Sequence, residues 1–265
     1  MKTNKALGTE KMSKLIRKFS VPCIFSLLIS ALYNIVDQIF IGNSSVGYLG
    51  NAATSVVFPI TIISFAFAWC FGDGAVALMS IHQGQKDEKS ISKIIGNSIT
   101  AIIIASIIYI LICAVFMEPL LRVFGASDAS LPLAKAYFNI ILYASTASML
   151  TGALTSVIRA DGKPAFSMVV NASGAIVNII LDPIFIFVLD WGIEGAAVAT
   201  VIAQLISFAL GMYYIIFKSR TFKLKLENLK FDFKIFWQFT KLGLSTFITQ
   251  MSTVIMVLEI GRAHV

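Results

Sequence analysis

The stretch "AFSMVVNASGAIVNIILDPIFIFVL", residues 165–189, decides the class of fold. It is longer than the roughly 20 residues that a helix needs to cross the hydrocarbon core of a bilayer. Its one ionisable residue is Asp182, which Asn178 precedes by one helical turn and Pro183 follows directly. What these three residues do depends on the solvent that surrounds the run.

Composition identifies that solvent. The 265 residues are 57% hydrophobic and 13% charged, whereas soluble domains have about 45–50% apolar and about 25% charged residues. The net charge of +7 is compatible with nucleic-acid binding, but the Lys and Arg residues fall in short segments between apolar runs. This pattern indicates a protein in contact with the lipid bilayer and excludes a nucleic-acid-binding face.

The chain contains seven apolar runs that are long enough to span a membrane. They lack the alternation of membrane β-strands, so we predict an all-α polytopic membrane protein. The expected spans are residues 17–41, 53–80, 94–116, 132–157, 165–189, 195–217 and 236–258.

The connections between the spans differ in charge. Most basic residues lie before the first span and in every second connection: Lys2, Lys5, Lys11, Lys14, Arg17, Lys18, Lys86, Lys89, Lys93, Arg159, Lys163, Lys218, Arg220, Lys223, Lys225, Lys230 and Lys234. The other connections carry Arg122 and Lys135 among acidic residues. Because basic loops stay in the cytoplasm, we expect a cytoplasmic N-terminus. The excess of Lys over Arg and the abundance of Ile indicate an AT-rich bacterial genome, so the expected membrane is a bacterial cytoplasmic (inner) membrane.

The basic stretch 218–235 divides the spans unequally. We expect residues 1–217 to form a six-helix transmembrane lobe, 218–235 a cytoplasmic linker, and 236–258 the first helix of a second lobe. The ending "EIGRAHV" fits neither a helix end nor a tail, so residues 259–265 are interpreted as a non-native tail on a fragment.

Three aspartates lie within the spans, where a charged group costs about 2.5–3.5 kcal/mol and marks a candidate site. At about 1.5 Å per helical residue, Asp37 lies about 7 Å, Asp182 about 12 Å and Thr200 about 9 Å from the outer ends of their helices. Asn178 and Asp182 share a helix face, as Tyr33 and Asp37 do. We therefore predict one site built from Asp37, Asn178, Asp182 and Thr200, with Tyr33 one turn before Asp37.

The chemistry of this site has two alternatives. Carboxylates with neutral oxygen donors suit a hard cation such as Na⁺, and two neighbouring carboxyls can instead share a proton. A structural alternative is that Asp182 caps a broken helix whose second half begins at Pro183.

Two other polar stretches have structural interpretations. We expect "GDG" at residues 72–74 to loosen its helix, with Asp73 satisfying the freed amides, and keep Asp73 as a possible secondary titrating site. The stretch "RADGKP" at residues 159–164 is expected to be a turn with solvated charges.

The stretches "ALYNIVDQIFIG" (31–42), "RADGKPAFSMVVNASGAIVNIILDPIFIF" (159–187) and "GIEGAAVATVIAQ" (192–204) resemble the multidrug and toxic compound extrusion (MATE) transporters. The resemblance implies two six-span lobes, of which the second is missing here beyond its first span. It also implies a first-lobe site for Na⁺ or H⁺ at Asp37, Asn178, Asp182 and Thr200, beside Tyr33, and bending of the first span near Pro22.

The function that follows is secondary active export. We expect an ion-coupled multidrug antiporter for small cationic or amphipathic compounds, monomeric at full length and without a cofactor beyond the coupling ion. The alternative is a flippase-type exporter of a lipid-linked or other amphipathic precursor. Such an exporter would be expected to carry cationic groups inside its spans to bind a pyrophosphate head, whereas here no Lys or Arg lies mid-span. An enzyme is not expected, because residues 70–73 lack the first Gly of the Gly-x-Gly-Asp motif of intramembrane aspartyl proteases.

Overall fold

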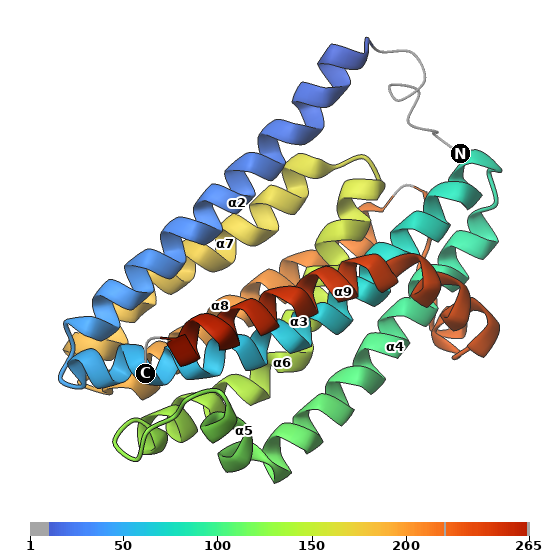
Figure 1. Ribbon diagram of the computed structural model, residues 1–265. Coiled ribbons are helices and arrows are strands. Elements are labelled where there is room, and N and C mark those ends of the chain that lie inside the picture. Colours follow the sequence, from blue (N-terminus) through green and yellow to red (C-terminus); the bar gives the residue numbers. More distant parts are fainter. Residues whose placement is uncertain (1–10, 220, 264–265) are drawn as a thin grey trace.

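The computed structural model describes residues 11–219 and 221–263, and within these ranges the regular structure is helical, with no strand (Figure 1). The described residues contain seven helices long and apolar enough to cross a membrane, which confirms the expected fold class. They are α2 (Met12–Gly42), α3 (Gly47–Gly84), α4 (Glu88–Val115), α6 (Leu131–Ala160), α7 (Pro164–Pro183) continued by the π-helical turn η1 (Ile184–Val188), α8 (Gly192–Tyr213) continued by the π-helical turn η2 (Tyr214–Lys218), and α9 (Phe233–Ala263).

Helices α3 and α6 form the centre of the bundle. They pack against each other, α4 lies against both, and α8 packs against α6. The largest core cluster contains Met79 of α3, Ile95 of α4 and Leu154 of α6. Because the remaining long helices surround this pair, α3 and α6 provide the rigid support on which a site in the bundle is built.

Helix α2 lies at the edge of the bundle, alongside α7 (Figure 1). Of its residues, Leu15, Asp37 and Ile41 are buried. Pro22 lies inside the helix, which the structure shows as one element from Met12 to Gly42. An edge helix that buries so few side chains can shift without breaking up the core.

Pro183 loosens the fifth span without breaking it. The chain passes directly from α7 into η1, where the amide of Leu189 donates to the carbonyl of Ile184. Proline cannot donate the α-helical bond to a preceding carbonyl, and π-helical turns commonly absorb such a defect. The helix is thus loosened after Pro183 but continuous, so the alternative in which Asp182 caps a second helix starting at Pro183 is wrong.

The expectation for "GDG" is also wrong, because α3 continues as an α-helix through residues 72–74. The two glycines serve packing instead. A Cβ atom on Gly72 would lie 2.7 Å from Cβ of Ala153 in α6, and one on Gly74 would overlap the backbone of Phe239 in α9. These glycines let α3 approach both neighbours closely, so Asp73 has no freed amides to satisfy.

The expected linker is docked onto the bundle. Its 3-10 turn η3 (Leu226–Leu229) packs on α4, where Thr100 Oγ1 donates to the Leu229 carbonyl at 2.7 Å. The Asn97 side chain donates to the carbonyl of Asp232 at 3.2 Å. These two bonds fix the backbone that leads into α9.

The turn after α6 differs from its expected solvated state. Asp161 is buried, and its carboxylate accepts hydrogen bonds from the Tyr214 hydroxyl at 2.6 Å and from the amide and hydroxyl of Thr221. Gly162 then reverses the chain with a φ of +82°, which favours glycine. The Asp161 carboxylate of "RADGKP" is therefore buried, and it connects the turn to η2 and to the linker.

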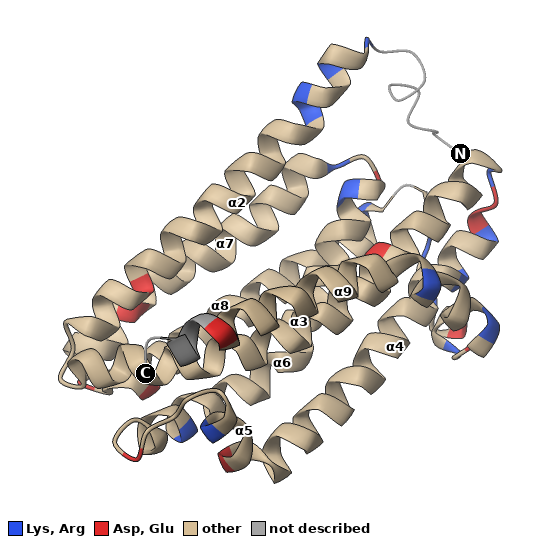
Figure 2. Cartoon of the chain, viewed as in Figure 1, with Lys and Arg blue, Asp and Glu red and all other residues tan. Residues whose placement is uncertain are grey.

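Charge is distributed unevenly along the bundle (Figure 2). Most Lys and Arg lie near the end that holds the start of α2, the α3–α4 turn and the linker, and the middles of the helices are largely uncharged. At the opposite end, Glu118 in the short helix α5 (Met117–Val123) pairs with Lys135 and Arg122, and these two cations lower the pKa of its carboxyl. Lys2 and Lys5 of the expected basic start, Arg220 of the expected linker, and residues 264–265 of the expected tail lie outside the described residues. Helix α9 itself continues past residue 258 to Ala263.

Candidate cation site

Three helices bring the predicted site residues together. Asp37 lies in α2, Asn178 and Asp182 in α7, and Thr200 in α8. Helix α7 packs against both α2 and α8, so a polar face of α7 at this level meets both neighbours. The spacing of four residues between Asn178 and Asp182 places both on that face.

The side chain of Asn178 links the members on α7 and α8. Its Nδ2 donates to Asp182 Oδ1 at 3.1 Å and to Thr200 Oγ1 at 3.3 Å. The carboxyl groups of Asp182 and Asp37 are close neighbours, which joins α2 to the cluster. Since two carboxylates repel each other, this contact is favourable when a proton or another cation lies between them.

The cluster is deeply buried. Asp182, Asn178 and Asp37 expose 0%, 1% and 7% of their surface. Three of their oxygens, Asp37 Oδ1, Asn178 Oδ1 and Asp182 Oδ2, have no hydrogen-bond partner among the described residues. Buried polar atoms are rarely left unpaired, because each costs about 1–3 kcal/mol. Three such oxygens in one cluster fit a bound cation or proton.

Two tyrosines flank the acidic residues. Tyr33, one turn before Asp37, lies close to the carboxyls of Asp37 and Asp182, as the sequence predicted. Tyr137 of α6 also reaches the site, where it lies near both carboxyls, Tyr33 and Thr200. We missed Tyr137 in the sequence, because α6 carries no intramembrane charge that would have marked it.

An apolar layer closes the site towards the α2–α3 turn. Ile41, Ile186 and Ala196 are buried against one another, with Tyr137 and Phe40 around them. Each of the three lies four residues from a site residue, namely Asp37, Asp182 and Thr200. The layer therefore lies one helical turn from the polar cluster and separates it from that end of the bundle.

Asp73 does not belong to this cluster. Among the described residues it makes no side-chain hydrogen bond or ion pair, and its side chain is partly exposed between the faces of α3 that meet α6 and α9. Within the described ranges, no group of three or more His, Cys, Asp or Glu residues is placed to hold a metal ion. The oxygens that this site offers to a cation therefore come from the carboxylates of Asp37 and Asp182, the amide of Asn178 and the hydroxyl of Thr200.

The polar cluster on three helices, with its apolar layer, can be compared with known proteins. A family model described as MatE matches residues 22–184, which include Asp37, Asn178 and Asp182. The chain belongs to the MatE family. This confirms the resemblance seen in the sequence.

Relatives of this MatE chain are named as export proteins rather than enzymes. "Multidrug export protein MepA" of Staphylococcus haemolyticus (strain JCSC1435) is 32% identical over 225 residues, covering 83% of this chain and 47% of the relative. The protein of the same name from Staphylococcus aureus (strain MRSA252) is 27% identical over 253 residues, covering 95% of this chain and 56% of the relative. The chain thus spans about half the length of these bacterial relatives.

Solved structures share the fold. The MATE multidrug transporter DinF-BH, solved as a complex, matches with a TM-score of 0.91 at 32% identity, covering 98% of this chain and 58% of that protein. An outward-facing MATE family transporter of the MOP superfamily matches with a TM-score of 0.79 at 25% identity, over 91% of this chain and 53% of that protein. The helical arrangement is therefore that of MATE multidrug efflux transporters.

Proposed function

We propose that the complete gene product is a secondary active antiporter that exports cationic or amphipathic compounds, driven by entry of Na⁺ or H⁺. The coupling cation binds among Asp37, Asn178, Asp182 and Thr200. The observation that carries this proposal is the set of three buried, unpaired oxygens on α2 and α7. A cation there neutralises the two carboxylates and supplies the partner that these oxygens lack.

The cation links the edge helix to the core. Asp37 is one of the few buried residues of α2, and its contact with Asp182 is a polar link from α2 to α7. Loss of the cation leaves two facing carboxylates that repel each other, and α2 is the helix least held by the core. Movement of α2, with Pro22 as the bending point, then couples ion binding to opening of the transporter.

The membrane setting follows from the distribution of charge. The N-terminus lies in the cytoplasm, because the end of the bundle with most Lys and Arg is the one that starts α2. The protein lies in the cytoplasmic membrane of a bacterium and acts as a monomer with no cofactor besides the coupling ion. A flippase function finds no separate support, since among the described residues no Lys or Arg lies at the middle of a span to bind a diphosphate.

The test is efflux by the complete gene product in bacterial cells that lack their own pumps. We expect Asp37→Asn and Asp182→Asn to reduce ethidium efflux to the background of empty cells, because neither amide can carry the charge that holds a cation. The control is Asp190→Asn, an exposed acidic residue at the end of the same span whose positive φ of 53° also suits Asn. It should retain efflux.

The coupling ion is identified in the same cells. If efflux depends on added Na⁺ at constant pH, the coupling ion is Na⁺. If efflux follows an imposed pH gradient in the absence of Na⁺, the coupling ion is H⁺. Wild-type rates in both Asp37→Asn and Asp182→Asn would refute the site.

A further inference from the structure

A groove runs along the outside of the bundle between α3 and α4. It has a volume of about 380 Å³, and α4 lies at the opposite edge of the bundle from α2 (Figure 1). Ala101 and Cys113 line the groove at positions about 18 Å apart along α4. Since one leaflet of the hydrocarbon core is about 15 Å thick, the groove has the length of the acyl chains in one leaflet.

The lining of this groove is apolar. Three isoleucines of α4 line it and expose 44%, 52% and 50% of their surface, namely Ile104, Ile108 and Ile112. Tyr109, between them in sequence, is buried, and its hydroxyl donates to the Ile60 carbonyl at 3.1 Å. A space without open polar groups does not hold ordered water. In a bilayer, the molecules that fill such a space are lipid chains.

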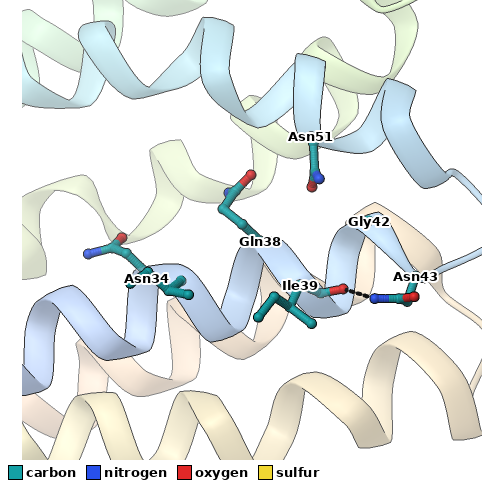
Figure 3. A pocket seen from close by; sticks show the side chains of 7 residues that line it. Asn34, Gln38, Ile39, Gly42, Asn43 and Asn51 are labelled. Carbon is teal, nitrogen blue, oxygen red and sulfur yellow. Dashed lines mark hydrogen bonds between the residues drawn. The ribbon is translucent and has the colours of Figure 1, made fainter.

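A groove beside α2 has a different character. There the side chains of Asn34, Gln38 and Asn51 line the space between α2 and α3 (Figure 3). Carboxamides lose free energy in hydrocarbon unless they are hydrogen-bonded, whereas isoleucine and phenylalanine do not. The groove between α3 and α4 is therefore the one suited to an acyl chain.

Aromatic side chains close the groove at the end where the linker enters α9. Phe231 and Phe236 line that end, with ring centroids 5.3 Å apart, and the ring of Phe71 in α3 lies 5.5 Å from that of Phe236. The hydrogen bonds from Asn97 and Thr100 fix the linker backbone on α4 at the same level. The closed end is thus built jointly by α3, α4 and the start of α9.

Two lysines flank this closed end. Lys230 and Lys234 lie on either side of Phe231 in sequence, both are exposed, and among the described residues neither forms an ion pair. Asp232 lies between them, but its carboxylate accepts hydrogen bonds from the amides of Lys234 and Ile235 at 2.9 and 3.3 Å, which caps α9. The two ammonium groups are therefore available to an anion at the mouth of the groove.

Trp237 indicates that this end of the groove lies at the level of the lipid headgroups. Tryptophan is enriched where the bilayer meets water. Trp237 lies near the start of α9 and exposes 51% of its surface, and the ammonium group of Lys241 lies over its ring, 5.3 Å from the centroid. The lysines at the mouth of the groove therefore lie at the depth of lipid phosphates, and the groove extends from there into the hydrocarbon.

We propose that this groove binds one acyl chain of an anionic phospholipid, whose phosphate is held by Lys230 and Lys234. The inference goes beyond the proposed export function, because it concerns the surrounding bilayer rather than the cargo or the coupling ion. Basic pockets between membrane helices bind anionic headgroups, because each lysine near the headgroup adds to the attraction. The bound lipid contacts α3, α4 and the start of α9, and so strengthens the contact between α4 and α9.

The experiment measures lipid bound to the complete gene product by native mass spectrometry, in detergent with equal amounts of phosphatidylglycerol and phosphatidylethanolamine. We expect the wild type to retain phosphatidylglycerol in preference to phosphatidylethanolamine. Lys230→Ala combined with Lys234→Ala should weaken phosphatidylglycerol binding by about 25-fold, about fivefold for each lysine. Ala105→Phe places a ring in the groove, which Ala105 lines, and should lower the binding of both lipids.

Matched controls make the same changes outside the groove. Lys223→Ala combined with Lys225→Ala removes the same charge from the same linker, and Ala114→Phe adds the same ring at an exposed position of α4. Both should bind lipid as the wild type does. A wild type that retains no phosphatidylglycerol would show that another part of the complete protein covers the groove, and would overturn the proposal.

Equal lipid binding within either matched pair of variants would overturn it as well. Because lipid binding is measured without transport, failure of the efflux test would refute the proposed function and leave this result unaffected.

Discussion

Asp161 shows how one residue holds three segments of the chain together. Its buried carboxylate accepts hydrogen bonds from Tyr214 at the end of the sixth span and from Thr221 in the linker, while Asp161 itself ends α6. Hydrogen bonds to a charged acceptor each stabilise a protein by about 1.5–3 kcal/mol. The residue therefore anchors the linker to the turn before α7.

We predict that Asp161→Ala releases the linker without unfolding the spans. Loss of the shared acceptor should make trypsin cleave faster after Lys218, Lys223 and Lys225, as measured by limited proteolysis of the purified protein in detergent. Tyr214→Phe removes one bond and should have a smaller effect. The control is Glu227→Ala, which breaks an exposed pair with Lys225. Equal cleavage rates in Asp161→Ala and Glu227→Ala would contradict this role.

At the residue scale, the sequence predicted that these polar residues lie together, because charge inside a span is costly and therefore conspicuous. Asp37 and Asp182 were found in this way, and helical spacing then added Tyr33 and Asn178. Tyr137 could not be found, because a tyrosine in an apolar span has many ordinary packing roles. The burial of Asp161 was missed for a related reason, since its partners Tyr214 and Thr221 are distant in sequence.

At the element scale, the contact between α3 and α9 depends on glycine. A Cβ on Gly74 would overlap the Phe239 carbonyl, and one on Gly243 would overlap the Cys70 carbonyl. The backbones of the two helices are therefore in direct contact at these glycines. Small residues at such contacts allow the close packing that holds membrane helices together. The interface is therefore intolerant of even one added methyl group.

We predict that Gly74→Ala destabilises the protein by about 1–3 kcal/mol, the usual effect of overpacking a tight contact. The measurement is the thermal unfolding midpoint in detergent. Gly84→Ala is the matched control at the end of the same helix, where an added Cβ meets no atom within 4 Å. A Gly74→Ala variant as stable as Gly84→Ala would show that α3 and α9 are not in close contact.

The elements themselves could be predicted in number and approximate position, because apolar runs of spanning length are a strong signal. The local state of the helices was harder to predict. The sequence "GDG" suggests a loosened helix, but packing against neighbouring helices keeps α3 regular. Its two glycines allow α6 and α9 to approach the α3 backbone closely. Pro183 had a clear local consequence, because a missing amide hydrogen changes the helix wherever it occurs.

At the scale of the whole molecule, the fold places a buried polar cluster between a well-supported core and a weakly held edge helix. Asn178, Asp182 and Thr200 belong to helices that pack around α6, whereas Asp37 belongs to α2 at the edge. The apolar layer of Ile41, Ile186 and Ala196 blocks one approach to the cluster. A cation bound there can therefore control how α2 lies against α7.

The most direct test of this account measures cation movement by the complete gene product in proteoliposomes loaded with ethidium. Intravesicular pH and ²²Na⁺ are followed while ethidium leaves. We predict that the wild type moves one of these cations against ethidium, that Asp190→Asn does the same, and that Asp182→Asn moves neither. Cation movement in Asp182→Asn at the wild-type rate, together with ethidium export, would contradict the central claim that this cluster carries the coupling ion.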